Sequence, residues 1–139
     1  MSVPKYKREE NKLQALVDTI NMTKYTIQMC ENERIFPKKC RWNICSRIMD
    51  NCLDSIVKIR QANKIRPTNK EQADQRTSLQ YEVLQNFEAL WTLMELAYNV
   101  YSISSEKMGN WSALMLEADE KVAAWRNHDI RDFKKKFSI

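Results

Sequence analysis

Four long segments of this chain repeat apolar residues every three or four positions, and this spacing limits the possible folds more than any other feature. Apolar residues at that spacing lie on one face of an α-helix. The chain has a single glycine, Gly109, whereas β-hairpins and nucleotide-binding loops need glycine for positive φ or for close backbone approach. We therefore expect an all-α protein, and its 139 residues correspond most simply to one domain.

The first two helices are expected at about residues 6–32 and 37–63. Proline is favoured in a first helical turn, which places the start of the second helix at Pro37, and Pro67 ends it. The residues expected on the inward faces of these two helices are Leu13, Leu16, Val17, Ile20 and Ile27, followed by Ile44, Cys45, Ile48, Met49, Cys52, Ile56 and Ile59.

The third helix is expected to follow a capping box in which Thr68 is the N-cap and Glu71 reaches back to it. It extends to about Tyr101, and Ser104 is the expected N-cap of the fourth helix. A polar, basic tail over residues 128–139 should fray unless it docks. The residues expected inside are Val83, Leu84, Phe87, Leu90, Trp91, Met94, Ala97, Tyr98 and Tyr101, followed by Trp111, Leu114, Met115, Ala118, Val122 and Trp125.

Very short connections place consecutive helices beside each other in antiparallel directions. We therefore predict an antiparallel up-down-up-down four-helix bundle over residues 1–127, followed by the basic C-terminal tail 128–139. No apolar run approaches the roughly 20 residues that a bilayer span requires. Residues 1–10 are charged and lack the apolar core of a signal peptide, so a cytoplasmic location is expected.

Charge is unevenly distributed along the chain. Residues 34–76 carry eleven Lys or Arg and four acids, a net charge of +7, whereas residues 77–125 carry a net charge of −5. A cationic segment of this kind either binds phosphates with release of counterions or is an ordinary solvated helix surface. Trp42 lies between basic residues and is the best candidate for an exposed ring. Arg41 is in line with the apolar stripe and is expected to extend along the bundle end or to pair with an inward carboxylate.

Catalytic and metal-binding patterns are not evident in the sequence. The only histidine, His128, is remote from the four cysteines, and Cys30, Cys40, Cys45 and Cys52 contain no Cys-x-x-Cys pair. We therefore interpret the cysteines as small core residues in a reducing compartment. No catalytic residue, metal or cofactor is predicted, and the function expected is binding.

The stretch 36–48, FPKKCRWNICSRI, resembles the start of the second helix in a group of small bacterial four-helix-bundle proteins. That group includes the accessory variability proteins of diversity-generating retroelements and proteins encoded in intervening sequences of bacterial large-subunit ribosomal RNA genes. The similarity spans about residues 13–125. Further matching positions are Ile59 to Asn63, Arg76, Leu96-Ala97, Ile103-Ser104 and Ala124-Trp125. Many relatives have glycine before the closing Trp, where this chain has Ala123 and Ala124.

The resemblance implies a specific function. Accessory variability proteins form pentamers with basic surfaces, bind nucleic acid, and partner the retroelement reverse transcriptase in error-prone cDNA synthesis from template RNA. For this chain, the resemblance implies a homo-oligomer that contacts RNA, DNA or an RNA–DNA hybrid. The residues expected at the nucleic-acid interface are Lys38, Lys39, Arg41, Arg47, Lys58, Arg60, Lys64, Arg66 and Arg76.

Two alternatives remain open from the sequence. The chain could be an rRNA intervening-sequence protein of unknown role, which a neighbouring rRNA operon rather than a reverse transcriptase gene would indicate. It could also be a purely structural or protein-interaction bundle, in which case nucleic acid would not bind even at low salt.

Overall fold

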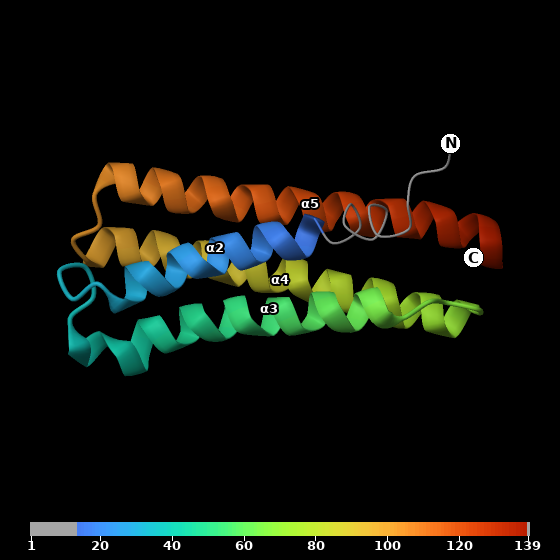
Figure 1. Ribbon diagram of the computed structural model, residues 1–139, viewed down its shortest axis with the longest axis horizontal. Coiled ribbons are helices and arrows are strands. Elements are labelled where there is room, and N and C mark those ends of the chain that lie inside the picture. The colour runs from blue at the N-terminus through green and yellow to red at the C-terminus, as the bar shows by residue number, and fades with distance from the viewer. Residues whose placement is uncertain (1–13, 139) are drawn as a thin grey trace.

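The computed structural model describes residues 14–138, and this part of the chain forms four long α-helices with no strand (Figure 1). They are α2 (Gln14–Glu31), α3 (Ser46–Lys64), α4 (Lys70–Val100) and α5 (Ser105–Phe137). A 3-10 turn, η1 (Lys38–Cys40), and one turn of π-helix, η2 (Arg41–Cys45), precede α3. The predicted all-α fold is thus confirmed for residues 14–138. The predicted helix start at residue 6 and the inward position of Leu13 lie outside the described residues.

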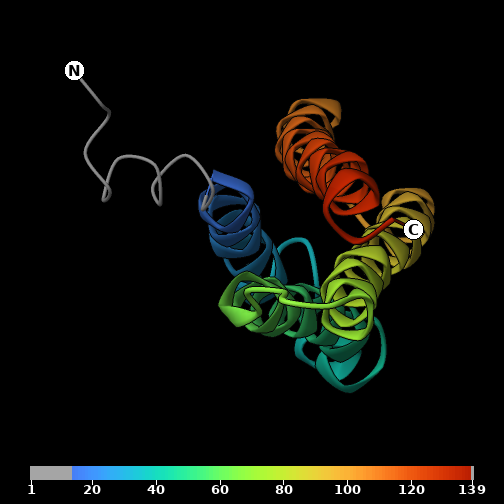
Figure 2. The same ribbon diagram turned by 90° about the vertical axis from the view of Figure 1, so that its right-hand side faces the viewer.

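Each helix packs against two neighbours. Helix α2 contacts α3 and α5, and α4 contacts the same two helices; Figure 2 shows the four helices end-on. Buried apolar residues from all four helices form one core. None of the helices within residues 14–138 is long and apolar enough to cross a membrane.

Helix α3 illustrates how the apolar spacing becomes a buried face. Its buried residues recur at intervals of three or four, as one side of an α-helix requires. Met49 and Ile56 border this face and are partly buried against the core, whereas Arg47, Leu53 and Arg60 are exposed. The buried residues of α3 are Ile48, Cys52, Ser55, Ile59 and Ala62.

Helix α2 differs from the expectation because much of its buried face is polar. Val17, expected inside, is 42% exposed, whereas Thr19, Thr23 and Thr26 are buried. The hydroxyls of these threonines donate to backbone carbonyls four residues earlier, at 2.7 to 2.8 Å. A buried hydroxyl with such a partner escapes most of the desolvation penalty, so threonine can occupy the core. The Thr26 Oγ also accepts a hydrogen bond from the buried Trp111 indole, 2.9 Å away.

The N-terminal cap of α4 lies one residue later than expected. Asn69, not Thr68, is the N-cap, and its side chain accepts a hydrogen bond from the backbone N–H of Gln72 at 2.9 Å. The Gln72 side chain reaches back and accepts from the Thr68 backbone N–H at 2.8 Å. The arrangement is related to a capping box, but the Gln72 side chain bonds the residue before the N-cap rather than the N-cap itself. Ser104 caps α5 as predicted, accepting from the Lys107 N–H at 3.1 Å.

The C-terminal segment also differs from the expectation of a frayed tail from residue 128. Helix α5 continues without interruption to Phe137, and Asp129 and Phe133 are buried. One carboxylate oxygen of Asp129 accepts hydrogen bonds from Arg76 Nε at 2.8 Å and from Gln80 Nε2 at 2.7 Å. Arg76 also donates to the backbone carbonyl of Ile65 at 2.9 Å. These bonds join α5, α4 and the connection after α3.

Replacing Asp129 with alanine should strongly destabilise the protein. The change leaves the buried Arg76 guanidinium without its carboxylate, which typically costs about 3–5 kcal/mol. Urea denaturation measures the loss. The matched control is Asp132→Ala, whose more exposed carboxylate pairs with Lys136 one turn away and should cost less than about 1 kcal/mol. Equal effects of the two substitutions would contradict docking of the C-terminal segment through Asp129.

Candidate nucleic-acid interface

The chain between α2 and α3 turns its apolar side chains inward and its cations outward. Cys40, Ile44 and Cys45 are buried, and Phe36 is fully buried with its ring 5.1 Å from that of Tyr101. These anchors fix the backbone of η1 and η2. The residues between the anchors are therefore held at the surface, and we name as the cationic turn Lys38, Lys39, Arg41, Trp42 and Arg47.

A π-helical turn gives this segment its local geometry. The Ser46 N–H donates to the Arg41 carbonyl five residues earlier, and the Ser46 Oγ lies 3.0 Å from the carbonyl oxygen of Trp42. Single π turns are often found at functional sites.

Trp42 is 89% exposed, as predicted for a ring between basic residues. Trp111, in contrast, is fully buried, and Trp91 and Trp125 are partly buried against the core, which confirms their assignment to the apolar stripes. Trp42 is therefore the tryptophan that remains open to a binding partner.

One carboxylate offsets part of the charge of the cationic turn. Glu33 lies 3.6 Å from the Lys38 ammonium and 3.7 Å from the Arg41 guanidinium. All three side chains are about half exposed or more, so these pairs are weak and a phosphate can replace the carboxylate. Lys39 and Arg47 are exposed and form no ion pair within residues 14–138. The turn therefore keeps a net positive charge.

The predicted interface does not form one continuous surface. Arg60, Lys64 and Arg66 are exposed but lie toward the opposite end of α3 from the cationic turn. At 1.5 Å per residue, Arg47 and Lys64 are about 25 Å apart along the helix. The Debye length is about 8 Å at physiological salt, so the two groups act on a polyanion separately.

Lys58 belongs to neither group. Its ammonium lies 2.9 Å from Asp54 on the preceding turn and 3.4 Å from Glu82 of α4. The hydrogen bond with Asp54 is the largest of the effects by which these two carboxylates raise the pKa of Lys58. Lys58 is therefore charged, but its charge is already paired. Its shortest contact is therefore within α3, and the contact with Glu82 links α3 to α4.

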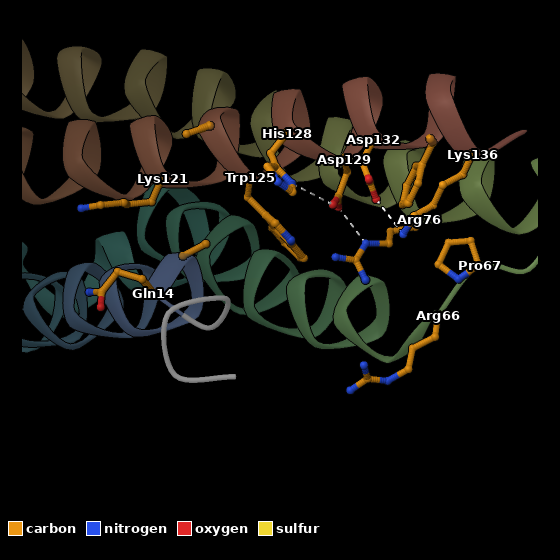
Figure 3. Close-up of a pocket in the computed structure, with 13 residues that line it drawn as sticks. Gln14, Arg66, Pro67, Arg76, Lys121, Trp125, His128, Asp129, Asp132 and Lys136 are labelled. Carbon is orange, nitrogen blue, oxygen red and sulfur yellow. Dashed lines mark hydrogen bonds and ion pairs between the residues drawn. The ribbon is translucent and has the colours of Figure 1, made fainter. Parts of the chain in front are cut away.

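Arg76, the remaining residue predicted at the interface, lies in a different environment from the exposed cations. Its side chain is buried, and its guanidinium lies 5.4 Å from the centre of the Trp125 ring while it bonds Asp129 (Figure 3). These groups form one wall of a surface cavity of about 660 Å³ near the C-terminal half of α5. The pairs Arg76–Asp129, Lys136–Asp132 and Lys121–Asp18 neutralise much of the charge around this cavity. Arg66, another residue predicted at the interface, also lines it.

The four cysteines are buried and free, as the sequence suggested for core residues. Burial raises the pKa of Cys30 and Cys45, and it raises the pKa of Cys52 to about 11. Thiols with raised pKa values are poor nucleophiles at neutral pH. No group of three or more His, Cys, Asp or Glu residues within 14–138 is arranged to hold a metal ion.

No protein-family model, curated protein or solved structure matches this chain. The resemblance to the accessory variability proteins therefore depends on the sequence positions alone.

The raised thiol pKa predicts a loss of stability in alkali. Between pH 9 and pH 11 the unfolded chain ionises Cys52 while the folded chain keeps it protonated, so the free energy of unfolding falls as pH rises. The contribution of Cys52 is about 2 kcal/mol by pH 11. Urea denaturation at pH 7 to 11 should show a shallower decline for Cys52→Ala than for the wild type. Parallel pH profiles would contradict the burial of a protonated thiol.

Proposed function

We propose that this protein is a non-enzymatic nucleic-acid-binding protein and that the cationic turn is its main contact with phosphates. The observation that supports the proposal is the grouping of four cations and an exposed indole on one anchored turn, with Glu33 the only carboxylate paired to it within residues 14–138. Ammonium and guanidinium groups neutralise phosphates and release their counterions.

The cations at the far end of α3 provide a second contact. A strand rising 3.4 Å per nucleotide covers the roughly 25 Å between Arg47 and Lys64 in about eight nucleotides. A strand long enough to contact both the cationic turn and the pair Arg60 and Lys64 should therefore bind more tightly than a short one. Phosphate contacts carry no sequence information, so base-specific binding is not expected from these groups.

The resemblance supports a narrower form of this proposal. In that form the protein is an accessory subunit of a retroelement reverse transcriptase, binds its template RNA or cDNA, and assembles as a homo-oligomer, a pentamer by analogy. Short connections also favour antiparallel, up-down-up-down packing of the helices. A reverse transcriptase gene beside the coding gene and copurification with that enzyme would support this role, whereas an rRNA operon in its place would favour the intervening-sequence alternative.

A protein-interaction bundle is the second candidate function. Leu53 and Val57 are each about half exposed and lie one turn apart on the outer side of α3. Apolar residues grouped at a surface often mark a protein contact. Measurement of mass in solution separates self-association from monomeric behaviour, and the binding experiment below shows whether nucleic acid is involved.

Binding to a single-stranded oligonucleotide should weaken steeply with salt. If the four cations of the turn each replace one counterion, the slope of log affinity against log salt is about −2.8. Affinity should then fall about 50-fold between 50 and 200 mM NaCl. Fluorescence anisotropy of a labelled strand measures both quantities. A slope near zero, or no binding at 50 mM, would contradict the proposal.

Lys39 and Arg47, the two cations of the turn that form no ion pair within residues 14–138, are the residues to substitute. Lys39→Gln with Arg47→Gln should reduce the salt slope by about 1.4, because two phosphate contacts are lost and no carboxylate is left unpaired. The control is Lys134→Gln with Lys135→Gln, which removes the same charge from exposed positions near the end of α5. If both double variants lose affinity equally, net charge rather than the cationic turn is responsible.

A further inference from the structure

Trp42 is the most exposed large apolar side chain of residues 14–138, at 89%, and the next, Val100, is 63% exposed. Its indole makes no ring or cation contact with any residue in that range. Aromatic side chains this open to water are unusual in a folded domain, because they normally bury most of their area. The exposed ring therefore needs an explanation beyond stability.

The ring is exposed although its backbone is fixed. Trp42 occupies the second position of η2, between the buried Cys40 and the buried Ile44. Its carbonyl accepts a hydrogen bond from Ser46, at 3.0 Å. A ring on an anchored backbone loses less conformational freedom on binding than a ring on a mobile loop, which favours its use as a contact.

The surroundings of Trp42 fit a nucleic-acid strand better than an apolar partner. Lys38, Lys39 and Arg41 lie within four residues of it and are all exposed. An aromatic ring among cations is the arrangement by which proteins hold single strands, since the ring stacks on a base while the cations contact phosphates.

We propose that Trp42 stacks on an unpaired nucleobase, so that the cationic turn binds single-stranded nucleic acid in preference to duplex. This inference depends on the proposed function and specifies the form of nucleic acid that the turn recognises. In a duplex the bases are already stacked and paired, so the indole has no free base face and the cations supply the remaining affinity. Either RNA or DNA meets this requirement, because every base has a face on which a ring can stack.

The experiment compares labelled 12-nucleotide oligo(U) with a 12-base-pair RNA duplex by fluorescence anisotropy at 50 mM NaCl. Trp42→Ala should weaken binding of oligo(U) about tenfold and change binding of the duplex less than about twofold. Trp42→Phe retains an aromatic face and should recover most of the oligo(U) affinity. Because the ring is 89% exposed and makes no ring or cation contact within residues 14–138, both variants should keep the wild-type circular dichroism spectrum and unfolding midpoint.

The control substitution is Leu53→Ala, which removes an exposed apolar side chain from α3 away from the turn and should leave both affinities unchanged. If Trp42→Ala weakens oligo(U) and duplex equally, or weakens neither, the stacking inference is overturned. The proposed function would survive that result as long as Lys39→Gln with Arg47→Gln still lowers affinity. Failure of the wild type to bind either nucleic acid would overturn both, and a change in self-association alone for Trp42→Ala would assign the ring to a protein contact.

Discussion

The burial of one face of α3 determines where the cations of this protein point. Ile48, Cys52 and Ile59 are at most 1% exposed, so the helix cannot rotate about its axis without exposing them to water. Loss of a single such side chain from a core costs about 1–5 kcal/mol, which is a large fraction of the stability of a domain. Each basic residue between these positions therefore points in a fixed direction. The length of the helix separates the basic residues at its N-terminal end from those at its C-terminal end.

The same packing divides the positive charge into groups with different uses. At the N-terminal end of α3 the cationic turn faces solvent around Trp42, and at the C-terminal end Arg60 and Lys64 form the second exposed group. Lys58, between them, is paired with carboxylates of α3 and α4. Arg76 is fixed between Asp129 and the Ile65 carbonyl, where it stabilises the docking of α5. The basic residues are thus divided between exposed groups and residues paired inside the structure, and only the packing distinguishes the two.

The sequence predicted the class of fold and much of the core because those properties follow from local spacing. Most apolar residues expected inside α3 and α4 are buried or partly buried, and the Trp42 ring is exposed as predicted. Tyr98, expected inside α4, is instead 39% exposed. The inward position predicted for Val17 was wrong because three threonines occupy part of the inward face of α2. Their hydroxyls bond their own helix, and a hydrophobic periodicity does not detect them.

The burial of Arg76 was not predicted because its partner, Asp129, lies 53 residues away in the sequence. A signal was nevertheless present in the spacing. Arg76 and Gln80 continue the stripe of Val83 at helical intervals, and Asp129 and Phe133 continue the stripe of Val122. Polar residues in line with an apolar stripe on two helices indicate a buried polar contact between them. Charge counts along a segment cannot reveal this, since they ignore the direction of each side chain.

In the proposed function, nucleic acid binds to one anchored turn at the end of the helical bundle. Mapping of chemical shifts tests this most directly, because the chain is small enough, at 16.6 kDa, for residue-by-residue NMR. On titration with oligo(U), the backbone amides of residues 38–47 and the Trp42 indole N–H should shift most, and those around Arg76 and Asp129 should not move. Shifts concentrated on α4 and α5, with the Trp42 indole unchanged, would contradict the account.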